Sequence, residues 1–584
     1  MAMIFDYVIV GGGSAGCVLA NRLSADPNKQ VALLEAGPDT PPEHISTEIY
    51  ALSFLPHYFG EQCYWTKLEA YVDPIGNHSV EEMMRSQKPR RYEQARIMGG
   101  GSTVNGQVAI RGLPSDYDEW DSVGARGWRW EDCLPYFRRL ERDMDFDGPL
   151  HGKEGPIPIH RTFPPDWGAF SLAFRDALAK KGIPYYDDCH GQFGDGCFPF
   201  PRNNILTHRV STAMGYLDGA TRLRKNLHIL PKTALEQIEF EGKRAVAALV
   251  RRDGQKERIE GREIIISAGA LHSPGILMRA GIGPGDQLQA LGIGVRSDRP
   301  GVGANLQEHP LVGIGIHLKP EGRLPPTMRN NFMLNMRFSS GLPGCPGQDM
   351  KLSVSNRFAW SKAGAHFGTT QFGPNKAYSK GFVRLRDKNP ESEPIVAFNL
   401  MSDPRDLRRT MDAVRFAIGV LQTPPASELT HSIFPGVYGE MIRNLTTQSR
   451  VNKIITDLAA HLLDVGGVAR KLVMSLAMKS KLTIDDLEKD DRKLEDWIHQ
   501  GVQGDWHACG TCKMGAPEDR AAVVDPEGRV YGVENLRVTD ASIMPTIPAA
   551  NTNISTIMIA EKMADTLLGR RAPRAREAAL SVSG

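Results

Sequence analysis

Residues Ile4–Gly16 read IFDYVIVGGGSAG, an apolar strand that runs directly into the pattern Gly11-x-Gly13-x-x-Gly16. In such a pattern the first glycine allows the tight turn, Gly13 lets the backbone approach a pyrophosphate, and Gly16 lets the next helix pack closely on the strand. The helix would point its unpaired N–H groups at the phosphates. The start of the chain therefore predicts a dinucleotide-binding βαβ unit.

The second strand of this unit, and the acidic residue at its end, follow at the spacing expected of such a unit. Val31–Leu34 predicts the strand, and Glu35 comes at its end, nineteen residues after Gly16. A carboxylate there accepts hydrogen bonds from both hydroxyls of an adenosine ribose and repels a 2′-phosphate, which disfavours NADP. The whole pattern favours a dinucleotide over a chance glycine-rich turn, and it does not separate FAD from NAD.

Composition and charge describe an ordinary globular protein with more than one core. The chain has 584 residues, of which 41% are hydrophobic and 24% charged. A net charge of +2 from 70 basic and 68 acidic residues argues against a nucleic-acid partner. Eight sparse cysteines, no room for a signal peptide before Ile4 and no long apolar window predict a cytoplasmic protein without a transmembrane segment.

The middle of the chain contains further strand patterns. Strands are predicted at Leu227–Leu230, Ala245–Val250 and Glu263–Ser267, and the last runs into a glycine turn that suits a second approach to the cofactor. The Pro- and Gly-rich stretch Gly191–Pro201 predicts a loop. Alternation in Lys351–Ser355 and Gly381–Leu385 predicts an antiparallel sheet between residues 311 and 504.

A helix follows this sheet in the sequence. Its apolar residues recur at helical spacing, at Ile454, Ile455, Leu458, Leu462 and Val465, and a basic and apolar stretch at 470–481 comes next. We expect this helix pair to be buried against the sheet; a dimer contact and a membrane-surface patch are the alternatives.

These patterns predict an α/β fold. A Rossmann-like cofactor-binding domain would be assembled from separated segments, with an inserted α+β substrate domain that contains the antiparallel sheet. We place the cofactor-binding domain at residues 1–158, 203–312 and 505–568, and the substrate domain at residues 159–202 and 313–504. Residues 569–584 form a tail that we expect to be disordered.

The C-terminal region contains residues suited to chemistry at a flavin. Because histidine side chains ordinarily titrate near neutrality, we expect that His507 can take the proton of an alcohol whose carbon loses a hydride. Asn551 would hold the same oxygen, and Thr552 or Asn553 would cap the helix predicted at Ile554–Leu567. Each residue alone has a plainer explanation, such as a core histidine or an ordinary cap. Their coincidence with a dinucleotide fold favours the catalytic interpretation.

His507, Cys509 and Cys512 also form an H-x-C-x-x-C pattern. Zinc needs a fourth ligand that the pattern lacks, and the Cys-x-x-Cys has no thioredoxin-like context. We therefore expect no metal and interpret the two cysteines as small buried thiols.

The chain resembles the glucose–methanol–choline (GMC) oxidoreductase family over nearly its whole length. Arg96-x-x-Gly-Gly-Gly-Ser-x-x-Asn105 with Arg111-Gly112 is similar to the family's first signature, and Gly269–Gly283 is similar to the second. Pro300–His309 and Ser402–Leu407 match further family stretches. Within the family, the sequence is most similar to bacterial hydroxymethylfurfural and aryl-alcohol oxidases.

The resemblance implies FAD rather than NAD and the oxidation of a primary alcohol, aromatic and furanic alcohols included, with electrons passed to O2 or another acceptor. It implies His507 as the base, Asn551 as its partner, and Trp506 and Val104 in the substrate pocket. Some members attach FAD covalently through a histidine where this chain has Val104, so we expect noncovalent FAD. The implied cofactor-binding residues are Gly11, Gly13, Ser14, Ala15, Gly16, Glu35, Ala36, Arg96, Gly99, Gly100, Gly101, Ser102, Asn105, Gly106, Leu235, Ala268, Gly269, Asp540, Ala541, Asn551 and Thr552.

Other functions are open at this point. One is a choline- or aliphatic-alcohol-type dehydrogenase that uses an acceptor other than oxygen. Another is a hydroxynitrile lyase that keeps FAD without net redox chemistry, and a third is a flavoprotein that serves only as a binding or membrane-docking module. The long segment 424–501 leaves the oligomeric state open, with a homodimer as one possibility.

Overall fold

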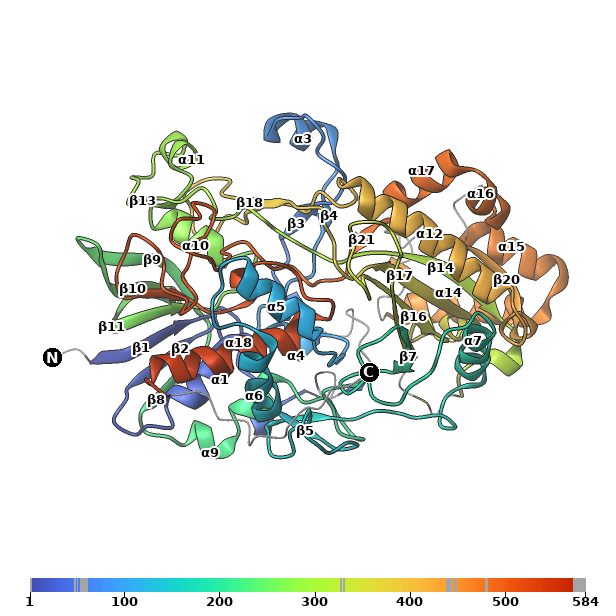
Figure 1. Ribbon diagram of the computed structural model, residues 1–584, viewed down its shortest axis with the longest axis horizontal. Coiled ribbons are helices and arrows are strands. Elements are labelled where there is room, and N and C mark those ends of the chain that lie inside the picture. Colours follow the sequence, from blue (N-terminus) through green and yellow to red (C-terminus); the bar gives the residue numbers. More distant parts are fainter. Residues whose placement is uncertain are drawn as a thin grey trace.

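Two seven-stranded sheets lie next to each other along the long axis of the molecule (Figure 1). The computed structural model describes residues 3–46, 49, 51–52, 61–325, 328, 331–436, 444–445, 449–477 and 482–570. One sheet is largely parallel and the other is antiparallel. The predicted α/β class with an antiparallel second sheet is confirmed.

The first sheet is built around the N-terminal strand. In spatial order its strands are β8 (Leu227–Leu230), β2 (Val31–Leu34), β1 (Ile4–Val10), β11 (Gln255–Ile266), β10 (Arg244–Arg252) and β9 (Thr233–Glu241), with β22 (Leu536–Val538) paired to β11. The predicted strands are all confirmed, but β10 and β11 are longer than predicted. The added residues of β11 form a charged hairpin arm with β10, where no apolar run marks a strand.

Helices on the first sheet bring distant parts of the chain together. α1 (Ser14–Leu23) packs against α18 (Thr552–Leu567), and α18 also contacts α6 (Trp130–Leu140). Other helices are α3 (Val80–Ser86), α4 (Gly101–Val104), α5 (Pro114–Ser122), α8 (Thr212–Tyr216), α9 (Gly219–Arg222), α10 (Ser273–Arg279), α11 (Gly285–Ala290), α16 (Ile484–Lys489) and α17 (Asp491–Gly501). The contact between α1 and α18 places the helix of residues 552–567 beside the glycine-rich turn.

Glu561 fixes α18 in this position, and its removal should destabilise the fold. Its carboxylate is fully buried and accepts hydrogen bonds from Arg22 (2.7 Å), Arg139 (2.8 Å) and the hydroxyl of Tyr216 (2.7 Å). Glu561→Ala leaves Arg22 without its carboxylate and Arg139 with Asp565 alone, so we expect the free energy of unfolding to fall by about 3–5 kcal/mol. Urea denaturation measures this change. The exposed Glu518→Ala is the control, and a loss below 1 kcal/mol for Glu561→Ala would contradict the prediction.

The second sheet is antiparallel throughout. In spatial order its strands are β20 (Thr430–Gly436), β14 (Pro310–Leu318), β17 (Phe367–Pro374), β16 (Met350–Ser355), β15 (Phe332–Phe338) and β7 (Gly196–Pro199), with β21 (Gln503–Gly504) paired to β14. β7 corrects the loop predicted at Gly191–Pro201. It is an edge strand that contains Pro199, and it forms only by pairing with a strand more than a hundred residues away.

The two faces of the second sheet differ in polarity. Leu334, Met336, Leu352 and Val354 belong to a core that includes α7 (Ala169–Lys180) and α12 (Pro404–Leu421). The residues that alternate with them line a cavity: Asn335, Arg337, Lys351, Ser353, Ser355, Thr369 and Gln371. Period-two alternation thus gives the sheet one apolar face and one polar face, and we call the second the polar sheet face.

Smaller sheets connect these layers. β18 (Phe382–Arg384), β19 (Ile395–Ala397), β3 (Glu69–Tyr71) and β4 (Arg90–Arg91) form one of four strands, so the strand predicted at Gly381–Leu385 is confirmed but lies outside the second sheet. Two-stranded sheets join β5 (Glu141–Asp143) to β6 (Ile157–Ile159) and β12 (Ile282–Gly283) to β13 (Ser297–Asp298). The domain boundaries stay a prediction; β14 begins within the segment that we assigned to the cofactor-binding domain.

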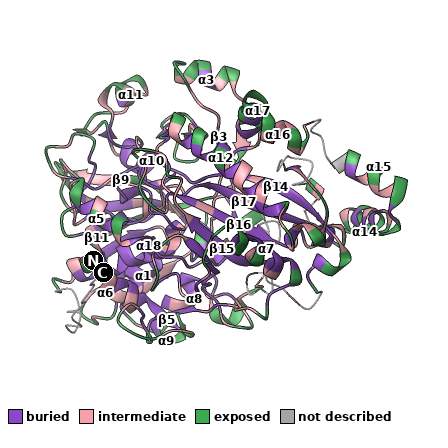
Figure 2. Ribbon diagram, turned by 45° about the vertical axis from the view of Figure 1, so that its right-hand side comes forward, coloured by how far each residue is buried: buried purple, intermediate pink, exposed green. Residues whose placement is uncertain are grey.

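The predicted burial of the helix at 454–465 is wrong. In α14 (Arg450–Val465) the side chains of Ile454, Leu458 and Val465 are 59–70% exposed. The helix instead buries Thr456, Ala460 and Leu463, and together with α15 (Gly467–Ala477) it lies at the periphery of the molecule (Figure 2). Apolar spacing defines the faces of a helix, but it does not say which face finds a partner within the chain.

Two predictions fall partly or wholly outside the described residues. These are the end of the basic stretch, at residues 478–481, and the tail from residue 571. Within the described ranges, every helix is too short or too polar to cross a bilayer.

Candidate active site

A cavity of about 880 Å³ is lined by residues of both large sheets. Nearly all of the predicted site residues contribute to its wall. They are Gly11, Gly13, Ser14, Ala15, Glu35, Ala36, Arg96, Gly100, Gly101, Val104, Asn105, Gly106, Leu235, Ala268, Gly269, Trp506, His507, Asp540, Ala541, Asn551 and Thr552. The fold therefore gathers four widely separated parts of the chain around one space.

Three of the predicted cofactor-binding residues lie behind this wall. Gly16 faces the turn, because a Cβ there would come within 1.9 Å of the carbonyl oxygen of Gly11. The hydroxyl of Ser102 donates to the carbonyl of Gly99 (2.6 Å). Gly16, Gly99 and Ser102 therefore shape the two glycine turns and are not among the residues that line the cavity.

The turn between β1 and α1 fits a pyrophosphate. Gly11 has a φ of +109°, which L side chains rarely adopt, and Gly13 stands directly before the first residue of α1. At the end of β2, the carboxylate of Glu35 accepts from the backbone N–H groups of Gly12 (2.9 Å) and Gly37 (2.7 Å). These two bonds hold the acid rigidly where a ribose would lie.

The start of α18 differs from the predicted cap. Asn551 is the N-cap residue but makes no side-chain capping bond, and Thr552 and Asn553 already belong to the helix. Asn553 accepts a hydrogen bond from Ser14 (2.8 Å), and its buried Nδ2 has no partner among the described residues. An unpaired donor in the wall, next to two helix N-termini, fits a cofactor that is rich in acceptor atoms.

His507 and Asn551 meet in the cavity wall. Nδ2 of Asn551 lies 2.9 Å from Nε2 of His507, which explains why the asparagine side chain does not cap α18. Trp506, the residue before His507, has a φ of +58° and donates from Nε1 to Glu93 (3.2 Å). The strained backbone places the indole at the cavity wall.

A second histidine fixes the tautomer of the first. Nε2 of His309 lies 2.9 Å from the carbonyl oxygen of Asn375 and 3.1 Å from that of Pro548. Carbonyl oxygens only accept, so this nitrogen carries the proton and Nδ1 of His309 is an acceptor. Nδ1 lies 2.9 Å from Nδ1 of His507, which must therefore be the protonated nitrogen of that ring. Nε2 of His507 is therefore the unprotonated nitrogen; it accepts from Nδ2 of Asn551 and can act as a general base.

Burial and nearby charges set the protonation state of His507. Burial lowers the pKa of His507 well below its usual range, and the charge of Lys351 lowers it further. Lys351 pairs with Asp505 (2.5 Å), whose carboxylate lies 3.5 Å from Nδ1 of His507. An imidazolium formed by proton uptake would therefore have a carboxylate beside it.

Glu308 holds the backbone of His309 and His507 in place. Its carboxylate accepts from the backbone N–H of His507 (2.8 Å), the N–H of His309 (2.8 Å) and the hydroxyl of Tyr92 (3.0 Å). Burial raises the pKa of Glu308 to about 7. No sequence pattern assigns a role to Glu308, His309, Lys351 or Asp505, although Glu308 and His309 lie in the stretch Pro300–His309 that is similar to the family.

Neither cysteine of the H-x-C-x-x-C pattern contacts His507 through a hydrogen bond in the described chain. Cys509 and Cys512 are buried free thiols, which confirms their predicted packing role.

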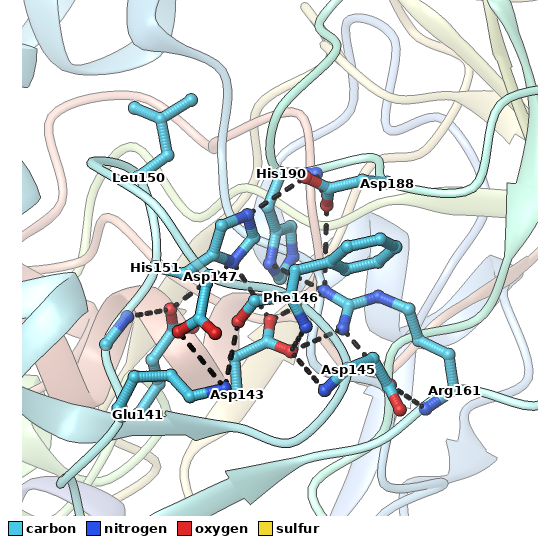
Figure 3. Close-up of polar contacts among 12 residues, drawn as sticks. Glu141, Asp143, Asp145, Phe146, Asp147, Leu150, His151, Arg161, Asp188 and His190 are labelled. Carbon is cyan, nitrogen blue, oxygen red and sulfur yellow. Dashed lines mark hydrogen bonds and ion pairs between the residues drawn. The ribbon is translucent and has the colours of Figure 1, made fainter.

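A separate cluster of charged residues lies buried in residues 141–190 (Figure 3). The ring of His151 lies between Asp143 (3.0 Å) and Asp188 (2.9 Å), and Arg161 pairs with Asp143 (2.9 Å). Burial lowers the pKa of His151, but the two carboxylates outweigh it and raise the pKa to about 9. His190 accepts from the backbone N–H of Arg111 (3.3 Å). These bonds fix the segment around Asp188 in place.

Family models of GMC oxidoreductases match residues 5–311 and 377–560. The chain belongs to the GMC oxidoreductase family. It is thus an FAD-dependent oxidoreductase that acts on alcohols, and the family, cofactor and reaction class predicted from the sequence are confirmed.

Individual GMC oxidoreductases are similar over nearly the full chain. A 5-(hydroxymethyl)furfural oxidase from Methylovorus sp. is 41% identical, with 97% of this chain and 99% of that protein covered. An oxygen-dependent choline dehydrogenase from Chromohalobacter salexigens is 33% identical, with 97% and 95% covered. The solved structure of pyridoxine 4-oxidase from Mesorbium loti has a TM-score of 0.80 at 26% identity, with 97% and 100% covered.

Proposed function

We propose that this GMC oxidoreductase oxidises a primary alcohol, aromatic or furanic, to the aldehyde, with His507 as the base. The observation that carries the proposal is the unprotonated Nε2 of His507, which lies in the cavity wall 2.9 Å from the amide nitrogen of Asn551. The similarity to 5-(hydroxymethyl)furfural oxidase supports the substrate class.

The residues of the wall suit both halves of the reaction. The alcohol hydroxyl would donate to Nε2 of His507, which takes its proton, while the amide of Asn551 donates to the same oxygen. As the O–H bond breaks, its electron pair forms the carbonyl and the carbinol hydrogen leaves as hydride. His309 and Asp505 hold the imidazolium on its Nδ1 side. FAD, when bound in the cavity, would supply the hydride acceptor and the route for electrons to O2 or another acceptor.

The binding residues for FAD follow from the cavity. Gly11, Gly13 and the N-terminus of α1 would hold the pyrophosphate, and Glu35 the ribose. Asp540 accepts from Gly269 N–H (2.8 Å) and fixes the second glycine turn. Since Val104 lines the cavity where a covalent link would need histidine, we propose that FAD binds noncovalently.

Anaerobic mixing with a panel of alcohols tests the proposal. Benzyl and furfuryl alcohols should bleach the flavin band, whereas a hydroxynitrile lyase or a binding module would leave it unchanged. Turnover with O2 and with an artificial acceptor then separates an oxidase from a dehydrogenase. A choline-type dehydrogenase, the alternative suggested by the second relative, would be bleached by choline and not by aryl alcohols.

The lowered pKa of His507 has a consequence for the pH dependence of flavin reduction. Only the neutral imidazole is a base, and its pKa lies well below 6.5, so the rate constant should stay flat from pH 8 to below pH 6.5. Lys351→Met removes a positive charge that lowers this pKa. The acid limb should then move to higher pH in stopped-flow measurements. An acid limb at the same pH in both proteins would contradict the electrostatic role of Lys351.

Two further properties are part of the proposal. All eight cysteines are free thiols, which supports a reducing compartment such as the cytoplasm. A homodimer stays a prediction, which light scattering of the purified protein tests.

A further inference from the structure

Two cations face each other on the polar sheet face. Arg337 in β15 is the direct cross-strand partner of Lys351 in β16, and both line the cavity. Like charges directly opposite each other on a sheet are unfavourable. Asp505 balances Lys351, but among the described residues no carboxylate pairs with Arg337. One buried guanidinium in the wall therefore has its positive charge uncompensated.

The surroundings of Arg337 hold it rigidly and leave donor capacity. Its side chain is 2% exposed, and one terminal nitrogen donates to the hydroxyl of Tyr186 (3.2 Å) and the carbonyl oxygens of Cys189 (3.3 Å) and Gln192 (2.7 Å). Its Nε has no partner among the described residues. The charged cluster around Asp188 fixes the loop that supplies these acceptors (Figure 3). A preorganised, buried and unbalanced guanidinium is the type of group that binds a carboxylate.

Neighbouring residues of the cavity wall connect Arg337 to the proposed base. Its guanidinium lies 5.3 Å from the ring centre of Phe198. Phe198 belongs to a small core that also contains Ala550, the residue before Asn551. On the strand beside it, Lys351 pairs with Asp505 (2.5 Å), whose carboxylate lies 3.5 Å from Nδ1 of His507. A flat molecule with its carbinol at His507 can therefore present its far end to Arg337.

Other side chains of this wall are also cationic. Arg202 and Arg357 line the cavity and donate to backbone carbonyl oxygens: those of Gly106 and Phe332 for Arg202, and those of Ala359 and Trp360 for Arg357. A trimethylammonium group would meet these charges with repulsion, whereas an anion would be attracted.

We propose that the alcohol oxidised by this protein carries a carboxylate, which Arg337 binds at the end of the molecule opposite the carbinol. The inference rests on the proposed function, since it assigns the substrate class of the same site. It makes Arg337 a specificity-determining residue.

A matched pair of alcohols tests the proposal on the FAD-loaded protein. 4-(Hydroxymethyl)benzoate and 4-(hydroxymethyl)benzamide have nearly the same size and differ in charge. We expect kcat/KM to be about 10- to 100-fold higher for the carboxylate, the range of a hydrogen bond to a charged group. Binding of 4-methylbenzoate, which has no carbinol, should perturb the flavin absorbance and compete with the alcohol. A selectivity ratio near one would overturn the proposal.

Variants of Arg337 separate its charge from a merely structural role. Arg337→Gln should bring the selectivity ratio close to one and weaken 4-methylbenzoate binding, and Arg337→Lys should restore part of both. Because the ratio compares two substrates in one protein, a general loss of activity cancels. The exposed Arg408→Gln on α12 should leave the ratio unchanged.

The outcomes also distinguish the inference from the function on which it rests. If neutral aryl alcohols bleach the flavin but the ratio is unaffected by Arg337→Gln, the carboxylate site is wrong and the function stands. If none of these alcohols bleaches the flavin, the proposed function itself fails.

Discussion

Exchange of His507 for alanine should slow anaerobic flavin reduction by roughly 10²- to 10⁴-fold while the protein stays yellow. The cofactor should be retained because His507 makes no contact with the glycine turn of β1 and α1 among the hydrogen bonds of the described residues, and Asn551 and α18 keep their backbone positions. The loss reflects the missing proton acceptor, the unprotonated Nε2 beside Asn551. Stopped-flow absorbance at the flavin band measures the rate.

Two controls make this experiment specific. His461→Ala replaces an exposed histidine on α14 and should reduce at the wild-type rate. Added imidazole should rescue His507→Ala in part, because it supplies the missing base within the cavity. Flavin reduction by His507→Ala within threefold of the wild-type rate would remove His507 from the mechanism.

Gly13→Ala should purify with little FAD although the apoprotein folds normally. The backbone of Gly13 has a φ of −75°, which alanine adopts, and an added Cβ would have the carbonyl oxygen of Ser267 as its nearest neighbour, at 3.9 Å. The methyl group therefore clashes only with a bound pyrophosphate. Overpacking of about 3 kcal/mol corresponds to a roughly 100-fold weaker Kd for FAD.

Titration of the apoprotein with FAD, followed by quenching of flavin fluorescence, measures this loss. Gly219→Ala adds the same methyl group at an open position at the start of α9 and should leave the Kd unchanged. Gly11→Ala gives a contrast, because its Cβ would meet Ser267 at 2.4 Å and destabilise the apoprotein itself. Normal FAD affinity in Gly13→Ala would move the pyrophosphate away from this turn.

The parts of the fold that could be predicted are those set by local pattern. β1, the glycine turn and β2 follow from residues within thirty positions of each other, and so does the link from Glu35 to the turn. β7 could not be predicted in this way, since its Pro- and Gly-rich sequence becomes a strand only through pairing with β15. For α14, the periodicity was correct and the buried face was not, because burial depends on the partner.

The same division holds for the candidate site. His507 and Asn551 stand in recognisable motifs, whereas His309 acts from 198 residues away through the carbonyl groups that hold its ring. The spacing of these residues in the sequence does not show that the tautomer of His309 fixes the tautomer of His507. Asn553 was predicted as a cap because its type and position suit one, but the helix starts earlier and its side chain contacts Ser14.

The different polarity of the two faces of the second sheet has a consequence for how the substrate preference of such an enzyme can change. On β15, β16 and β17, alternate side chains line the cavity and the others pack in the core. Positions 335, 337, 353, 355, 369 and 371 can thus be exchanged in a directed-evolution library without disturbing the hydrophobic interior or the nucleotide-binding turn, whereas Lys351 is tied to Asp505 beside His507. Single substitutions at these positions should change which alcohols the protein prefers and should have little effect on folding.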